Sequence, residues 1–135
     1  MSLEAEELDR RIQAWIEHGA DEGEEGAAKF GELAVELFAY QYEHNAVYRR
    51  VCRVRRVEPG RLTRWSQIPA VPLTAFRESV LVCEPAERAA AVIETSGSTD
   101  PGRRGRHHHP HLRLYDASLR ANFAHQFLPD RADCT

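Results

Sequence analysis

The fold and the chemistry expected of this chain depend above all on the stretch Ala89-Ala90-Ala91-Val92-Ile93-Glu94-Thr95-Ser96-Gly97-Ser98-Thr99-Asp100-Pro101-Gly102-Arg103-Arg104-Gly105-Arg106. A short apolar segment leads here into a loop of small and hydroxyl-bearing residues that ends in arginines. Backbone N–H groups, hydroxyls and guanidinium groups are together well suited to surround an anion. Gly97 lets the backbone approach phosphate oxygens without a Cβ in the way. The stretch therefore predicts phosphate binding, in particular of a polyphosphate.

This loop resembles the phosphate-binding signature of the adenylate-forming enzymes, in which a Thr-Ser-Gly-Ser/Thr-Thr-Gly core is followed by Pro-Lys-Gly. Two flanking segments narrow the resemblance to the acyl-protein synthetases (LuxE-type), which are relatives of phenylacetate-CoA ligase. These segments are Ile68-Pro69-Ala70-Val71-Pro72-Leu73-Thr74-Ala75-Phe76-Arg77 and Leu114-Tyr115-Asp116-Ala117-Ser118-Leu119. The resemblance extends over residues 60 to 130.

The resemblance implies an ATP-dependent ligase that activates a carboxylic acid, such as a fatty acid, as acyl-AMP and releases pyrophosphate. The acyl group then passes to a protein thiol or, in the phenylacetate-CoA ligase relatives, to coenzyme A. ATP and Mg²⁺ are the expected cofactors, and no catalytic residue and no separate metal site are assigned. The residues expected to hold the ATP phosphates are Thr95, Ser96, Gly97, Ser98, Thr99, Arg103 and Arg104. His107 or His109 is expected to line the acyl or adenylate pocket.

Two positions differ from the signature. Asp100 stands where the signature has glycine, and Arg103 or Arg104 takes the place of its lysine. Arginine keeps the positive charge but contacts phosphate through a planar fork of N–H groups. The pair Arg103-Arg104 also argues against a Walker-type loop, which requires Lys followed by Ser or Thr.

Other site chemistries are less well supported. Consecutive histidines in an extended segment point in different directions, so His107, His108 and His109 do not predict a metal site. The basic block 49–64, with Tyr48 and Trp65 as stacking groups, would suit nucleic acid, but the acidic N-terminal region argues against this partner. The second hypothesis is a non-catalytic remnant or interaction module.

Composition indicates one domain of ordinary apolar content, with 135 residues, 42% hydrophobic residues and a net charge of −3. Residues 1–32 contain ten acids and three bases, whereas residues 49–77 contain eight arginines and one acid. Such blocks are typical of solvated faces, and attraction between them within one fold explains them as well as a partner does. Three cysteines without paired spacing and the absence of a long apolar run predict a cytoplasmic protein that does not span a membrane.

The pattern of apolar residues divides the chain into a helical part, 1–57, and a part with strands, phosphate loop and helix, 58–135. Helical spacing predicts a first helix that Ser2 caps, and a second that continues to Asn45 or Tyr48. A short helix is expected at 74–77 and a longer one from Asp116. The runs 80–83 and 89–93 predict strands buried on both faces, in an α/β domain of the adenylate-forming type. Two such strands cannot complete a covered sheet, so the chain is expected to be an N-terminal fragment that lacks turnover by itself.

Overall fold

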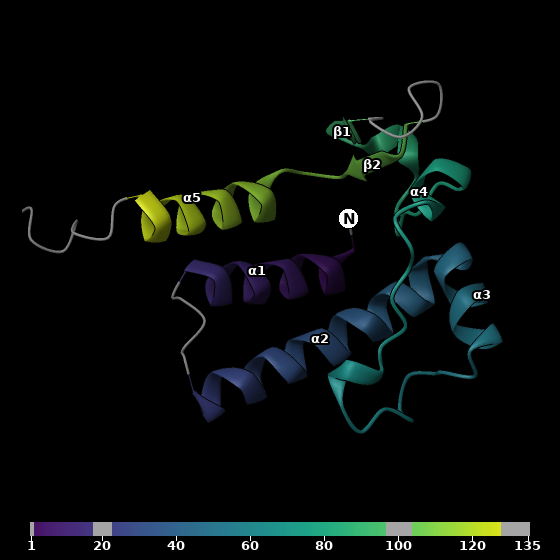
Figure 1. Ribbon diagram of the computed structural model, residues 1–135, viewed down its shortest axis with the longest axis horizontal. Coiled ribbons are helices and arrows are strands. Elements are labelled where there is room, and N and C mark those ends of the chain that lie inside the picture. Colours follow the sequence, from purple (N-terminus) through teal and green to yellow (C-terminus); the bar gives the residue numbers. More distant parts are fainter. Residues whose placement is uncertain (1, 18–22, 97–103, 128–135) are drawn as a thin grey trace, which may run out of the picture.

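The computed structural model describes residues 2–17, 23–96 and 104–127, without the side chain of His125. These residues form five α-helices, two short 3₁₀ helices and one antiparallel β-hairpin, so the described part is mostly helical (Figure 1). No parallel sheet occurs in it. The elements are α1 (Leu3–Glu17), α2 (Glu24–His44), α3 (Ala46–Val54), η1 (Trp65–Gln67), α4 (Ala75–Glu78), η2 (Ala86–Arg88), β1 (Ala91–Glu94), β2 (Arg106–His109) and α5 (Arg113–Phe127).

The first helix begins as its sequence predicts. The hydroxyl of Ser2 accepts a hydrogen bond from the backbone N–H of Ala5 at 3.2 Å, which satisfies one of the free N–H groups of the first turn. Leu8 and Ala5 are buried on the inner face of α1, which packs against α5 and α2. Helical spacing and a hydroxyl cap were therefore sufficient to predict α1.

The second helix ends at Asn45, one of the two predicted positions, and a helix that was not predicted follows it. Asn45 leaves helical geometry, with φ −116° and ψ 100°, and its side chain accepts a hydrogen bond from the backbone N–H of Tyr48 at 2.9 Å. It therefore ends α2 and caps α3, which follows directly. The buried side chains of Phe38, Tyr48 and Cys52 form the core at this junction. The break positions residues from both helices around one cluster.

The proline-rich segment after α3 is held against this core. The hydroxyl of Tyr48 donates a hydrogen bond to the backbone carbonyl of Pro69 at 2.9 Å. Ile68 and Val71 pack against the same cluster. The predicted turn at 58–60 and the short helix near 74–77 are both present, the latter as α4.

The two strands predicted to be buried on both faces are not found in that form. Residues 80–83 form no strand, and β1 pairs with β2 in an antiparallel hairpin, with Ala91 opposite His109 and Glu94 opposite Arg106. Val92 is 48% exposed. The α4 helix packs against β2, and a single hairpin has too little surface to be covered on both sides. The loop thus joins two strands instead of leading from a strand into a helix.

The last helix begins one turn earlier than predicted and has two dissimilar faces. Ala117 is buried and α5 packs against α1, whereas the four large residues spaced four apart are exposed: Tyr115, Leu119, Phe123 and Phe127. Small residues permit close approach of α1, and the large apolar residues point away from it. Among the described helices, none is both long and apolar enough to cross a lipid bilayer.

Candidate functional site

The two ends of the predicted phosphate loop are joined by a pair of hydrogen bonds. The backbone N–H of Thr95 donates to the carbonyl of Gly105 at 2.9 Å, and the N–H of Gly105 donates to the hydroxyl oxygen of Thr95 at 3.0 Å. Gly105 is buried, and a Cβ there would lie 3.3 Å from carbons of both Phe76 and Thr95. A larger residue at the base of the loop would therefore require Phe76 and Thr95 to move by a few tenths of an ångström.

Three of the predicted phosphate-binding residues lie in the described part of the chain, and four lie outside it. Thr95 directly follows β1 and is half-buried, and Ser96 is exposed beside it. The hydroxyl oxygen of Thr95 is already an acceptor, but its proton can still be donated to a ligand. Arg104 is exposed at the opposite end of the loop. The residues outside the described ranges are Gly97, Ser98, Thr99 and Arg103.

Glu94, which the sequence patterns did not single out, lies below the loop between two arginines. Its carboxylate is 3.7 Å from Nη1 of Arg104 and 3.1 Å from Nε of Arg106. All three side chains are well exposed, so each pair contributes about 0–1 kcal/mol. An anion bound at the loop can therefore compete with Glu94 for Arg104. Glu94 is recognised only from the register of the hairpin, which places it opposite Arg106.

The structure separates the two histidines that were predicted to line a pocket. The ring of His107 stacks on Phe76, with centroids 4.2 Å apart, and His107 is not among the residues that line the cavity described next. His109 does line that cavity and lies edge-on to Tyr115, with centroids 6.1 Å apart. Because β2 ends at His109, its side chain reaches the junction between the hairpin and α5.

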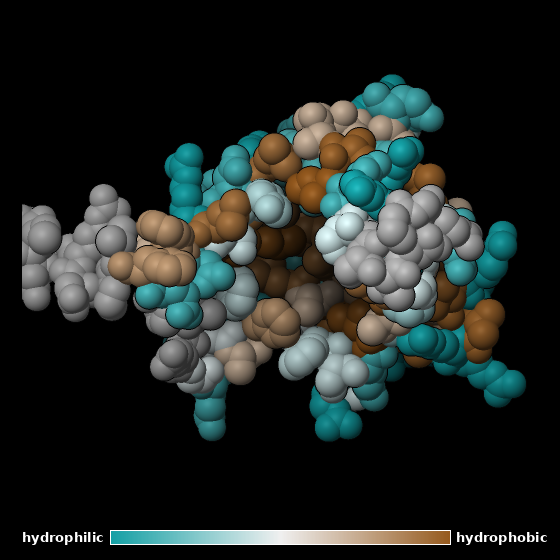
Figure 2. All heavy atoms as spheres, turned by 45° about the horizontal axis from the view of Figure 1, so that its top comes forward, coloured by the Kyte–Doolittle hydropathy of each residue, from teal (hydrophilic) through white to brown (hydrophobic). Residues whose placement is uncertain are grey.

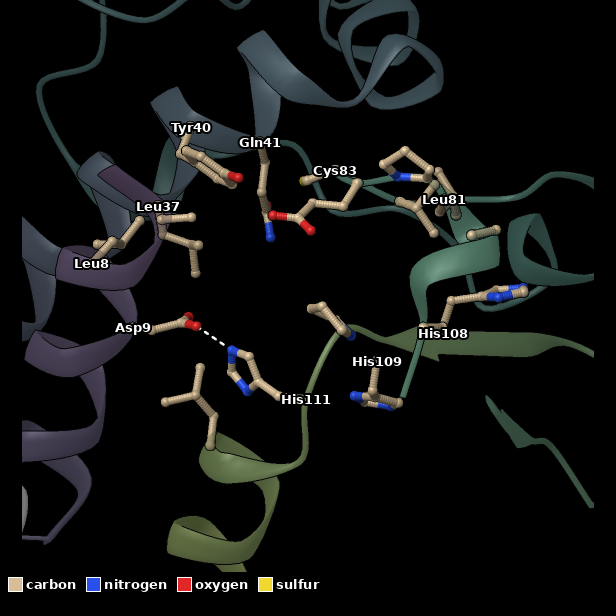
Figure 3. A pocket seen from close by; sticks show the side chains of 18 of the residues that line it. Leu8, Asp9, Leu37, Tyr40, Gln41, Leu81, Cys83, His108, His109 and His111 are labelled. Carbon is tan, nitrogen blue, oxygen red and sulfur yellow. Dashed lines mark hydrogen bonds and ion pairs between the residues drawn. The ribbon is translucent and has the colours of Figure 1, made fainter. Parts of the chain in front are cut away.

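A cavity of about 500 Å³ lies between α1, α2, the segment 81–89 and the junction of β2 with α5 (Figure 3). Its walls are mostly apolar, and Figure 2 shows a hollow with an apolar floor on this side of the molecule. The volume falls in the range of small-molecule binding sites. The lining includes Leu8 and Asp9 of α1, Leu37, Tyr40 and Gln41 of α2, Leu81 and Cys83 of the segment, and His108, His109 and His111.

Polar groups line this cavity at more than one place, with Asp9 and His111 on one side and the ring of His108 pointing away from them (Figure 3). Nε2 of His111 is hydrogen-bonded to the carboxylate of Asp9, which links the start of α5 to α1. The Nδ1 atoms of His108 and His111 are buried and have no hydrogen-bond partner among the described residues. Buried polar atoms without partners are uncommon in proteins. A bound molecule with a hydrogen-bonding head group can satisfy them.

Two titratable groups of the cavity are shifted by burial. Burial raises the pKa of the Cys83 thiol, and the neighbouring Glu84 raises it further. Burial likewise raises the pKa of Tyr40. Both groups therefore stay protonated and uncharged at neutral pH. The described residues contain no cluster of three or more side chains placed to hold a metal ion.

Residues far apart in the sequence meet at this cavity, such as Asp9 and His111, which are 102 positions apart. No local pattern marks Asp9 or Gln41, so of the residues discussed here sequence reasoning indicated only His109. Together, the fold and the site define a small, mostly helical domain with a hairpin loop and an apolar cavity. The chain has no match among the protein families, curated proteins and solved structures with which it was compared.

Proposed function

We propose that this domain acts in the ATP-dependent activation of a carboxylic acid as acyl-AMP, in an enzyme of the acyl-protein synthetase type. The loop between β1 and β2 would hold the β- and γ-phosphates of ATP with its accompanying Mg²⁺. Its N–H, hydroxyl and guanidinium donors would stabilise the charge that develops on the departing pyrophosphate. The cavity would receive the apolar part of the acid.

The observation that carries this proposal is that the loop and the cavity lie at opposite ends of one strand. Gly105 closes the loop, β2 follows at once, and His109 lines the cavity. At 3.3 Å per residue, Gly105 and His109 are about 13 Å apart along the strand. This separation suits a ligand with phosphates at one end and an organic group at the other.

The α/β organisation expected from the resemblance forms part of the same proposal. Within the described residues each strand of the hairpin pairs on one edge only. Strand edges with free N–H and C=O groups are where further strands add to a sheet. A larger sheet would therefore extend from β1 or β2.

Calorimetry of the 135-residue chain with ATP and Mg²⁺ tests the phosphate assignment. Arg104→Gln is expected to weaken binding about tenfold, because a charge-assisted hydrogen bond contributes about 1.5–3 kcal/mol. Gly97→Val is expected to abolish binding through a Cβ that blocks the backbone. Arg120→Gln, an equal charge change on exposed α5, is the matched control. ATP binding that is the same in all four proteins would refute the assignment.

The acceptor of the acyl group is proposed to be a protein thiol, with coenzyme A as the alternative. Thioester formation distinguishes them when the enzyme is given radiolabelled acid, ATP and either acceptor. A non-catalytic interaction module is the second candidate, and the exposed apolar face of α5 favours it. That candidate predicts no ATP binding and no pyrophosphate release with any carboxylic acid.

A further inference from the structure

We propose that an exposed arginine surface on α3 docks an acidic surface of a partner protein. This surface consists of Arg50, Arg53 and Arg56 with Val54 between them, at the end of α3 and in the turn that follows. The docking surface does not depend on the proposed function. Only the identification of its partner as the protein that accepts the acyl group rests on that function.

The three arginines of this surface are not neutralised by the described part of the chain. All three are exposed, and no described acid forms an ion pair with any of them. Two neighbouring arginines, in contrast, are hydrogen-bonded to the backbone. Arg49 donates to the backbone carbonyl of Tyr42 at 2.7 Å, and Arg55 donates to that of Ala70 at 3.0 Å. The arginine surface therefore remains available to an outside anion.

The acidic N-terminal region does not supply the missing partners. The sequence left open whether residues 1–32 and 49–77 attract each other or a partner, and no ion pair in the described ranges joins these blocks. Asp9 is paired with His111, Glu7 with Arg10, and Glu4 lies near His44. These acids of α1 therefore have partners other than the arginines of α3, although α1 begins beside the end of α2 that adjoins α3 (Figure 1).

Arg56 holds a backbone conformation that favours glycine. Its φ is 57°, and it is the one described non-glycine residue with positive φ. The N–H of Val57 bonds to the carbonyl of Cys52 at 3.0 Å, so Arg56 is the left-handed residue that closes α3. A long cationic side chain thus occupies a position where glycine would remove the strain. Strain of this kind is commonly found at functional positions.

The surroundings of the surface favour a protein over a nucleic acid. Tyr48 is buried with its hydroxyl bonded to Pro69, and Trp65 packs edge-on against Phe30 with centroids 5.1 Å apart. The Tyr48 ring is therefore closed to base stacking, and Trp65, which is 49% exposed, belongs to η1 and not to the arginine surface. Val54 is 80% exposed among the arginines. Arginine around an apolar contact is typical of protein interfaces.

The position of the surface suits an acyl acceptor. In Figure 1, α3, α4 and the loop end of the hairpin lie at the same end of the molecule's longest axis. A protein docked on α3 would therefore approach the end where the phosphate loop lies. Arg104 and Arg106, at the end of that loop, would extend the basic surface toward the same partner.

A short polyglutamate peptide with a fluorescent label is the probe for this surface. Anisotropy at low salt should detect binding to the 135-residue chain, and binding should weaken steeply between about 0.01 M and 0.15 M salt as screening increases. Arg50→Gln, Arg53→Gln and Arg56→Gln combined should weaken it at least about tenfold, or 1.4 kcal/mol. Arg120→Gln on α5 is the control and should bind as the wild type does.

The single variant Arg56→Gly separates docking from folding. It should raise the melting temperature because the left-handed strain is removed, and it should weaken peptide binding because a charge is lost. Unchanged peptide binding by the triple variant would overturn the proposal. So would equally tight binding of an oligothymidylate with the same number of charges, since the surface would then take any polyanion.

The same variants titrated with ATP keep the two proposals distinct. The triple variant should bind ATP as the wild type does if its arginines act only in docking. Peptide binding by a chain that does not bind ATP would support the surface and remove the acyl acceptor as its partner. ATP binding without peptide binding would overturn the surface and leave the proposed function in place.

Discussion

The side chain of Thr95 accepts a hydrogen bond from the backbone N–H of Gly105 across the base of the loop, at 3.0 Å. This bond, together with the reverse bond from the N–H of Thr95 to the carbonyl of Gly105, holds the ends of the loop together. A residue predicted to contact phosphate is thus also a structural residue. Its role in shaping the loop can be measured separately from any role in binding.

Thr95→Val is expected to lower the free energy of unfolding by about 1 kcal/mol, because it leaves the N–H of Gly105 without its partner while preserving the shape. Thr95→Ser keeps the hydroxyl and should lose less. Urea unfolding followed by circular dichroism measures both variants. Equal stability of the valine variant and the wild type would mean that the bond contributes nothing to the fold.

The buried face and the exposed face of α5 are expected to differ in how well they tolerate substitution. Ala117→Leu should cost about 1–3 kcal/mol, because the added atoms meet α1 at a buried position. Leu119→Gln, on the exposed face, should change stability by less than about 0.5 kcal/mol. Thermal melts of the two variants provide the comparison. A large loss in Leu119→Gln would show that the outer face is covered in solution, for example by self-association.

The buried phenol of Tyr48 is expected to make the protein less stable at alkaline pH. Burial raises the pKa of its phenol above the ordinary value of about 10. The stabilisation from the neutral phenol is therefore complete below about pH 10 and is lost as the pH rises toward the pKa of the folded state. Tyr48→Phe should be less stable by about 1 kcal/mol at pH 7, because the carbonyl of Pro69 loses its donor.

The same variant should show a shallower decline of stability above pH 10, because one proton release that favours unfolding is absent. Urea midpoints measured at neutral and alkaline pH test both effects. Parallel declines in the wild type and Tyr48→Phe would mean that Tyr48 does not titrate differently on folding.

Cys83 is expected to react slowly with iodoacetamide at neutral pH. Burial and the charge of Glu84 both raise the pKa of its thiol, and only the thiolate is the nucleophile. Glu84→Gln should accelerate alkylation, and the rate should rise with pH in both proteins. Peptide mass spectrometry separates this site from Cys52, whose full burial provides an unreactive reference. Alkylation of Cys83 at the rate of a free thiol would contradict the shift.

Local signals predicted most of the helices. Ser2 marked the start of α1, and apolar spacing located α2 and α5, because these depend on residues a few positions apart. The end of α2 at Asn45 was one of the two predicted positions, whereas α3, which begins directly after it, was not predicted. The runs 80–83 and 89–93 were misjudged since a short apolar run does not reveal whether a partner strand exists.

The sequence alone therefore determined most of the helices, the Ser2 cap, the turn at 58–60 and a glycine-rich loop after a strand, because each depends on neighbouring residues. Only the tertiary structure decided that the loop joins two antiparallel strands, that His109 and not His107 reaches a cavity, and that Asp9 meets His111. These features depend on contacts between distant segments, and their free energy comes from packing that no local pattern records.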